Sequence, residues 1–279
     1  MTKSAPLKRS LLFIFGPPVL LSFLGVGLLV QSVSTASPKL EMVNEQISIN
    51  AAPGVVPPTP GLTDYIYPRL TIDSANQPLV VVNKLRALDP IDFAPPSLTV
   101  MPSSESLDNS RELVLAPSAA NALVLMAERM HAEGYGQLFV NSAYRTYDYQ
   151  AELFESKTRQ YGLAGALVRS AKAGHSEHQT GLAVDVSVPV QGCAIMTCFG
   201  ETVGGKWVAA NSWRFGFIVR YEEETTAITG YSYEPWHLRF VGEELANEYS
   251  KNGIHTLEEF WSLPAAEFYP EEVAESKID

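Results

Sequence analysis

Residues 176–185 of the 279-residue chain read SEHQTGLAVD, and the small, apolar and β-branched run that begins inside this stretch predicts a buried strand. Gly181 can adopt backbone conformations that are closed to other residues, so we expect it to form the bend that leads into the strand. His178 then lies before the bend and Asp185 within the strand. The two side chains are therefore expected to be close enough to share one ion.

A second motif, EPWH at residues 234–237, supplies the other polar groups of the candidate site. A catalytic zinc takes three protein ligands and keeps a fourth position open for water. His178, Asp185 and His237 meet this need, and Glu234 is left to accept a proton. Pro235 blocks ladder pairing at its own position, so Glu234 and His237 can both point into the cleft. The two motifs together predict a zinc hydrolase.

The two motifs also carry a family resemblance. Residues 176–185 are similar to the S-x-H-x-x-G-x-A-x-D signature of the LAS metallopeptidases (lysostaphin, D-Ala-D-Ala carboxypeptidases, sonic hedgehog), and the chain most resembles the VanY-type D-alanyl-D-alanine carboxypeptidases. The resemblance runs from about residue 79 to about residue 260. At Ala173 the chain departs from it, because relatives usually carry proline there; the change removes no ligand. The supporting segments are LVVVNK at 79–84, SAYRT at 142–146, RFGFIVRY at 214–221 and TGYSYEPWHLR at 229–239.

The resemblance implies that Zn²⁺ is the cofactor and that Glu234 and Arg145 are the catalytic residues. Zinc lowers the pKa of water from about 15.7 toward about 7, and Glu234 accepts the proton. A positively charged guanidinium group held in place, such as that of Arg145, stabilises the oxyanion that forms when water attacks the carbonyl. The resemblance further implies that His178, Asp185 and His237 are the metal ligands. It also implies that Gln150 and Ser176 bind the substrate.

Several residues of this set have structural alternatives. Arg145 can instead be the partner of a structural ion pair, and Ser176 can be a loop cap. His131 and His255 are expected to be solvated surface groups. His175 is the one competing ligand, and we expect it to line the entrance of the cleft.

The resemblance implies a zinc-dependent D,D-carboxypeptidase that removes the terminal D-alanine from peptidoglycan stem peptides or their precursors. An L,D-carboxypeptidase or a peptidoglycan endopeptidase with the same zinc site is the alternative, because pocket walls decide between them. A non-catalytic, zinc-stabilised surface binding module is a further alternative. Glu234 argues against that module, which has no need for a base beside an open metal position.

The net charge of the chain limits the classes of molecule that it is expected to bind. The formal net charge of −11 argues against nucleic-acid partners, because a phosphate backbone would be repelled. The protein is expected to act as a monomer.

The first residues indicate where the protein works. Lys3, Lys8 and Arg9 precede an uncharged run at residues 11–30, which matches the roughly 20 residues that span a bilayer. Pro17 and Pro18 are unfavourable in an uninterrupted helix, and the small residues at 34–36 resemble a signal-peptidase cleavage site. A cleaved signal peptide is therefore the alternative to an anchor. We expect an extracytoplasmic enzyme held to the cell membrane by a single-pass anchor, with secretion after signal cleavage as the alternative.

Four segments are expected along the chain. A signal-anchor or signal peptide at 1–36 is followed by a proline-rich extracytoplasmic linker at 37–61, a zinc peptidase domain at 62–265 and an acidic, solvated tail at 266–279. In an oxidising compartment Cys193 and Cys198 are expected to form a local disulfide that shapes one edge of the cleft.

The peptidase domain is expected to be α+β and LAS/hedgehog-like. Helices pack on one side of a small antiparallel sheet, and the zinc site lies on its exposed face. Helices are expected at 116–133, 147–159 and 163–172, with a capping box at Thr256 to Glu259 opening a final helix. Strands are expected at 138–142, after Gly181, near 217–221 and near 238–241.

Overall fold

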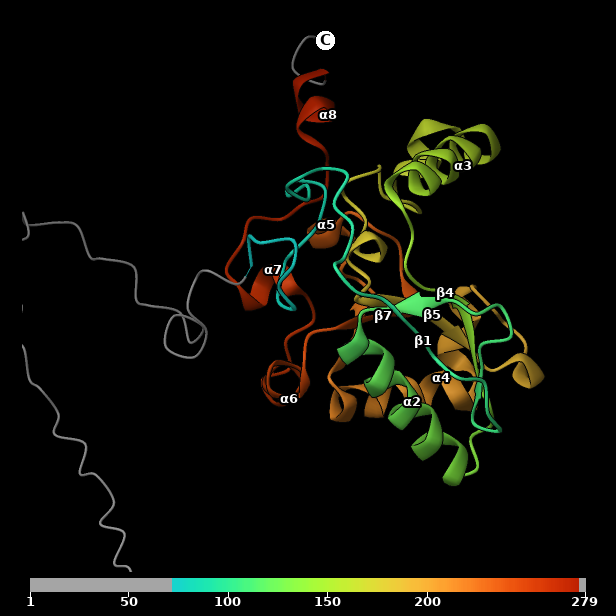
Figure 1. Cartoon of the computed structure of the whole chain (residues 1–279). Coiled ribbons are helices and arrows are strands. Elements are labelled where there is room, and N and C mark those ends of the chain that lie inside the picture. The colour runs from blue at the N-terminus through green and yellow to red at the C-terminus, as the bar shows by residue number, and fades with distance from the viewer. Residues whose placement is uncertain (1–71, 276–279) are drawn as a thin grey trace, which may run out of the picture. The chain divides into compact units, whose positions relative to one another are not determined.

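The computed structural model describes residues 72–275 (Figure 1). The chain divides into two units, residues 1–56 and 57–279, and every described residue belongs to the second. The predicted anchor at 1–36 and linker at 37–61 lie outside the described residues. Within residues 72–275 no helix combines the length and apolar character that a membrane span needs.

A five-stranded sheet organises the domain. Its order is β2-β4-β5-β7-β6, with β2 and β4 parallel and every other pair antiparallel. The predicted α+β fold with a small antiparallel sheet is thus confirmed, with one parallel pair added at the edge. The strands are β2 (Leu107–Asp108), β4 (Leu138–Ser142), β5 (Ala183–Ser187), β6 (Phe217–Tyr221) and β7 (Glu234–Phe240), and β1 (Thr99–Val100) pairs separately with β3 (Val114–Leu115).

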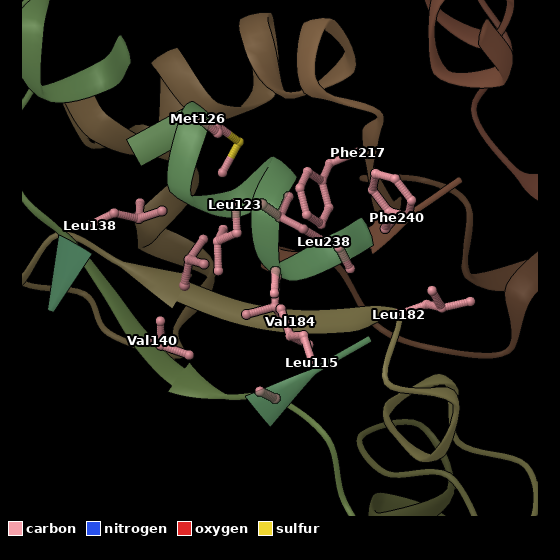
Figure 2. Close-up of a cluster of buried hydrophobic side chains, with 14 of the residues drawn as sticks. Leu115, Leu123, Met126, Leu138, Val140, Leu182, Val184, Phe217, Leu238 and Phe240 are labelled. Atoms are coloured by element: carbon pink, nitrogen blue, oxygen red, sulfur yellow. The ribbon is translucent and has the colours of Figure 1, made fainter. Parts of the chain in front are cut away.

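Helix α2 (Pro117–Ala132) covers one face of the sheet. Its buried stripe contains Leu123 and Met126, which pack in one cluster with Val184 of β5 and Leu238 of β7 (Figure 2). α4 (Val203–Asn211) adds two buried side chains to the same cluster, and both helices lie on the same side of the sheet in Figure 1. The predicted helix at 116–133 is confirmed, because its proline at the first turn and its apolar spacing are local signals.

The bend at Gly181 is also confirmed. Gly181 has φ 71°, in the left-handed region, and ends the short 3₁₀ helix η2 (Glu177–Thr180) just before β5. A Cβ atom there would approach the backbone nitrogen of Ala116 at 3.2 Å. Both the backbone conformation and the available space therefore favour glycine.

Helix α3 (Tyr147–Leu167) joins two of the predicted helices. Gly162 interrupts it with φ 71° and ψ 168°, and the helical part ends at Leu167 rather than at residue 172. The first predicted helix is confirmed, and Thr146 caps it by accepting a hydrogen bond from the Tyr149 backbone nitrogen. The second is shorter than predicted.

The C-terminal part of the domain is rich in short helices. The capping box at Thr256 is confirmed, because its hydroxyl accepts from the Glu259 backbone nitrogen at 3.0 Å, although the helix that it opens is not the last one. The helices are α5 (Thr226–Thr229), α6 (Glu243–Lys251), α7 (Leu257–Phe260) and α8 (Pro270–Glu275), with 3₁₀ turns η3 (Pro189–Gln191), η4 (Thr197–Glu201) and η5 (Ser212–Phe215).

The segment from residue 266 differs from the solvated tail that was expected. Ala266 and Tyr269 are buried, and the Tyr269 hydroxyl accepts a hydrogen bond from the Lys172 backbone nitrogen at 2.8 Å. The Tyr269 ring also lies under the ammonium groups of Lys84 and Lys172. These aromatic and cation–π contacts hold the segment on the domain as far as Tyr269.

Candidate active site

The register of the sheet brings two of the three predicted ligands together. Asp185 of β5 and His237 of β7 are direct cross-strand partners, so their side chains leave the sheet on the same face. His178, in η2, joins them from the turn before Gly181. All three residues are at most 5% exposed, and they line a cavity on the face of the sheet opposite α2.

The three side chains fit a small divalent cation. Asp185 Oδ1 lies 3.4 Å from His178 Nε2 and 3.2 Å from His237 Nδ1. Two ligands of a tetrahedral zinc ion, each bound at about 2.1 Å, lie roughly 3.4 Å apart. Asp185 Oδ1 is buried and has no hydrogen-bond partner among the described residues, which is a costly state for a carboxylate oxygen unless a cation satisfies it.

Hydrogen bonds on the far side of each ring fix which nitrogen faces Asp185. His178 Nδ1 donates to the Ala143 carbonyl oxygen at 2.7 Å, so the ring's lone pair is on Nε2. His237 Nε2 lies 3.3 Å from Glu177 Oε2, so its Nδ1 faces the site. Each imidazole therefore turns an unprotonated nitrogen toward the same point when it is neutral.

The pKa values of the two histidines move in opposite directions. Burial, and then the positive charge of Arg145, lower the pKa of His178 to about 4. Burial also lowers the pKa of His237, but its contacts with Asp185 and Glu177 outweigh burial and raise it to about 9. His178 is thus ready to bind a cation at neutral pH, whereas His237 releases a proton when it does so.

Glu234 has the position and acidity of a general base. Its Oε2 lies 3.7 Å from His237 Nδ1, at the start of β7, and its side chain is 15% exposed. Burial, followed by the negative charge of Asp185, raises the pKa of Glu234 to about 7. This pKa is that of the metal-free protein, and a bound cation would lower it, so the carboxylate would be ionised and able to accept a proton at neutral pH.

Arg145 is both an ion-pair partner and a cavity residue. It donates from Nη2 to Asp185 Oδ2 at 2.8 Å, from Nε to Ser142 Oγ at 2.9 Å and from Nη1 to Gln150 Oε1 at 3.3 Å. These contacts use three of the five guanidinium N–H groups and leave the others for a bound molecule. Its predicted role at the scissile carbonyl stays a prediction that this geometry accommodates.

The two predicted substrate-binding residues differ in position. Ser176 lines the cavity over the site, and its side chain makes no capping hydrogen bond. Gln150 is buried and does not line that cavity. Its amide donates to Ser170 Oγ and the Ala171 carbonyl while its oxygen accepts from Arg145, so its contacts are those of a support for Arg145.

The other histidines lie outside the site. His131 and His255 are exposed as expected, and His255 pairs with Glu222 at 2.6 Å. His175 does not line the cavity, in contrast to the prediction, because its Nδ1 bonds to the Asn83 carbonyl and its ring packs edge-on against Tyr269.

A cavity of about 630 Å³ lies over the ligands and Glu234. The predicted disulfide between Cys193 and Cys198 is present, and its loop lines the cavity with Ile195 and Met196. Three basic side chains line it in addition to Arg145: Arg111, Lys157 and Arg169.

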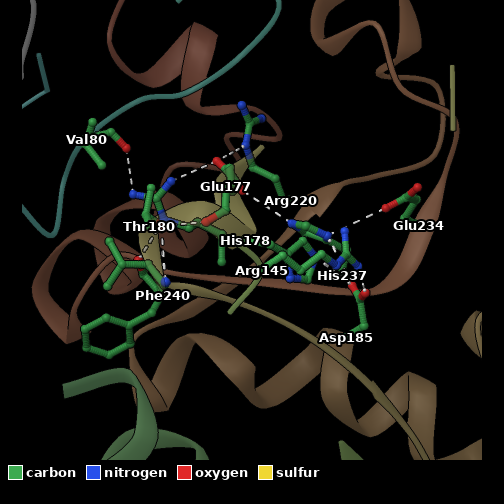
Figure 3. A network of polar contacts seen from close by, with 12 residues as sticks. Val80, Arg145, Glu177, His178, Thr180, Asp185, Arg220, Glu234, His237 and Phe240 are labelled. Atoms are coloured by element: carbon green, nitrogen blue, oxygen red, sulfur yellow. Dashed lines mark hydrogen bonds and ion pairs between the residues drawn. The ribbon is translucent and has the colours of Figure 1, made fainter. Parts of the chain in front are cut away.

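The sequence interpretation missed a buried group of charges behind His237. Glu177 contacts His237, Arg220 and Arg239, and each of these arginines is 0% exposed (Figure 3). A usable signal was present, because Arg220 and Arg239 interrupt the apolar strands FIVRY and EPWHLRF and buried charges require partners.

Comparison with known proteins matches these observations. The model of the VanY family, described as D-alanyl-D-alanine carboxypeptidase, matches residues 112–243. The chain is 38% identical over 192 residues to the putative carboxypeptidase YodJ of Bacillus subtilis, covering 68% of this chain and 69% of YodJ.

Solved structures agree with the sequence relatives. The LdcB LD-carboxypeptidase has a TM-score of 0.61 and 38% identity, and the alignment covers 67% of this chain and 87% of LdcB. The vancomycin-resistance D,D-pentapeptidase VanY, solved in complex with Zn(II), has a TM-score of 0.55 and 31% identity over 65% of this chain and 97% of that one. The chain therefore belongs to the VanY family of D-alanyl-D-alanine carboxypeptidases, which are metallopeptidases of the LAS group.

Proposed function

We propose that the protein is a zinc-dependent D,D-carboxypeptidase that removes the terminal D-alanine from peptidoglycan stem peptides or their precursors. The observation that carries the proposal is the cluster of His178, Asp185 and His237 around an unpartnered buried carboxylate oxygen, with Glu234 beside it. Membership of the VanY family and the Zn(II) complex of the VanY relative support zinc as the cation.

When bound there, zinc supplies a Lewis acid that activates water and polarises the peptide carbonyl. Glu234 accepts the proton of the attacking water and delivers it to the leaving amine. Arg145 directs its remaining N–H groups at the oxygen of the scissile carbonyl, where negative charge grows in the transition state. The ion pair with Asp185 and the bond from Gln150 hold the guanidinium in place before substrate binds.

The charge of the cavity supports a substrate with a free carboxylate. The whole chain carries a net charge of −11, yet Arg111, Lys157 and Arg169 line the cavity together with Arg145. Clefts that concentrate one sign of charge attract ligands of the opposite sign. A stem peptide that ends in D-alanine presents its terminal carboxylate to such a cavity.

An L,D-carboxypeptidase is the second candidate. The observation that favours it is the likeness to the LdcB LD-carboxypeptidase, which has the higher TM-score and identity of the two solved relatives described above. The same residues serve either reaction, since the two substrates differ in the configuration of the residue before the terminal D-alanine. The walls of the cavity decide which of them fits.

We also propose that the catalytic domain works outside the cytoplasm, held by the segment at residues 11–30. The disulfide between Cys193 and Cys198 supports an oxidising compartment, where such bonds persist. Fractionation of cells that express the chain tests this, and recovery of the protein with the cytoplasm would contradict it.

Zinc-loaded protein should be incubated with four substrates: a pentapeptide that ends in D-Ala-D-Ala, its C-terminal amide, a tetrapeptide that ends in an L,D-linked alanine, and a crosslinked muropeptide. Products are identified by mass. We expect cleavage of the pentapeptide and no cleavage of the amide, because the neutral amide cannot form an ion pair with the basic side chains that line the cavity. Preference for the tetrapeptide would select the L,D reaction, and equal rates on acid and amide would select the endopeptidase.

A further inference from the structure

Glu177 stands directly behind one of the candidate metal ligands. Its Oε2 lies 3.3 Å from His237 Nε2, on the side of the imidazole ring opposite Asp185. The Glu177 side chain is 0% exposed, so water does not compete for this contact. Arg220 and Arg239 both form ion pairs with its carboxylate, and a carboxylate in such pairs accepts hydrogen bonds.

Two arginines occupy the other oxygen of Glu177. Oε1 accepts from Arg220 Nε at 2.9 Å and from Arg239 Nη1 at 2.8 Å. Since both arginines bind the same oxygen, the carboxylate is held with Oε2 toward His237. In Figure 3 dashed lines join Glu177 to Arg220 and to His237.

Both arginines are themselves anchored by segments distant in the sequence. Arg220 donates two hydrogen bonds to Glu258 of α7, at 2.9 and 2.7 Å, and Glu258 also accepts from Asn83 at 2.9 Å. Arg239 donates to the carbonyl oxygen of Val80 at 2.6 Å. Two buried arginines thus balance two buried glutamates, and only Glu177 reaches a metal ligand.

We propose that Glu177 is a positioning residue that selects the tautomer of His237 able to bind the cation. A neutral imidazole carries one N–H, and Asp185 Oδ1, 3.2 Å from Nδ1, is an attractive acceptor for it. With a proton on Nδ1, His237 would have no lone pair to offer to the cation. Glu177 provides the competing acceptor at Nε2, so the proton stays there and the Nδ1 lone pair faces the cation. Carboxylates behind metal-bound histidines also raise their basicity.

This inference rests on the proposed metal site, but its readout is metal binding and not turnover. A chain that binds zinc and cleaves no peptide would therefore overturn the proposed function and leave this inference standing. A wild-type chain that binds no zinc would overturn both.

The direct test compares Glu177→Gln with Glu258→Gln in the full chain. Both changes remove one buried negative charge that faces Arg220 and keep the side-chain volume, but only Glu177 contacts His237. In Glu177→Gln the amide oxygen is held by the arginines, so the amide NH₂ faces Nε2 and donates to it. This inverts the hydrogen bond and moves the imidazole proton to Nδ1.

Zinc dissociation constants are measured by competition with a chelator at pH 8, on protein whose folding is verified by circular dichroism. We expect Glu177→Gln to bind zinc on the order of 10–100-fold more weakly than wild type. Glu258→Gln should match wild type. Unchanged affinity in Glu177→Gln, or equal losses in both variants, would overturn the proposal.

A second measurement needs no variant, in case Glu177→Gln does not fold. Nitrogen-15 correlation spectra of zinc-loaded wild type report which ring nitrogen of His237 carries the proton. We expect the proton on Nε2 and the metal on Nδ1. A metal-bound Nε2, or a proton on Nδ1, would overturn the assignment.

Discussion

The two faces of the β5–β7 strand pair are both buried, yet they are built differently. Val184 and Leu238 point into an apolar cluster under α2, whereas their neighbours Asp185, His237 and Arg239 point to the opposite face. The apolar face gains stability from packing, which tolerates many side chains of suitable volume. The polar face must pair every charge, so each residue there depends on specific partners. Burial alone therefore does not distinguish the core from the site.

The largest effect is expected on the polar face at Glu234. Glu234→Gln should retain zinc and the fold but nearly abolish turnover, because an amide accepts no proton from water and a positioned base contributes about 10²–10⁴-fold. Steady-state kinetics on zinc-loaded protein checks this, with a change at the exposed residue Glu243 of α6, Glu243→Gln, as the matched control. Retained kcat would show that another group is the base.

Arg145→Ala should lower kcat on the order of 10²–10³-fold, since the loss of one oxyanion donor typically has that effect. Zinc content must be measured in parallel, because Arg145 also pairs with Asp185. Arg111→Ala is the control, as Arg111 lines the same cavity but donates to the Asn141 carbonyl and not to Asp185. A change confined to KM would reassign Arg145 to ground-state binding.

On the apolar face the expected loss is in stability. Leu123→Ala should lower the free energy of unfolding by about 2–5 kcal/mol, because it leaves a cavity in a fully buried cluster. The kcat of the folded, zinc-loaded protein should stay near wild type. Denaturant unfolding and kinetics on the same preparation separate the two, and a large drop in kcat would show that the faces are coupled.

The smallest effect concerns the cost of ionising Glu234. Its pKa is raised from 4.5 to about 7, so the folded chain holds this proton more tightly than the unfolded chain does. The contribution of Glu234 to the stability of the metal-free protein should therefore fall as pH rises from about 4.5 to about 7. Above pH 7, metal-free Glu234→Gln should be more stable than wild type by up to roughly 3 kcal/mol.

Thermal unfolding of both metal-free proteins at pH 5 and pH 8 measures this difference. The stabilisation by Glu234→Gln should be present at pH 8 and largely absent at pH 5. A difference that is equal at both values would mean that Glu234 ionisation carries no such cost.

The sequence signals that succeeded were local. The bend at Gly181, the helix from Pro117 and the strand at residues 138–142 follow from residue type and periodicity over a few positions. The two motifs predicted the three residues of the cluster, in which the sheet register pairs Asp185 with His237 and the turn at η2 adds His178. Spacing alone gives the ligand types but not the ring nitrogen that each histidine presents.

What could not be predicted depends on contacts between distant segments. The arginine partners of Glu177 lie 43 and 62 positions away, and Tyr269 accepts a hydrogen bond from Lys172, 97 positions earlier. The substrate-binding role of Gln150 stays a prediction, and Ser170 and Ala171 on another segment set the orientation of its amide. No local pattern reports such pairings, because they exist only after the chain has folded.

The central claim is that the polar face of the β5–β7 pair forms the zinc site. Metal analysis of the purified wild type and of the His178→Ala, His237→Ala double variant, after identical dialysis against zinc, tests it most directly. We predict one zinc per chain in the wild type and essentially none in the folded double variant. Full zinc occupancy in the double variant would contradict the account.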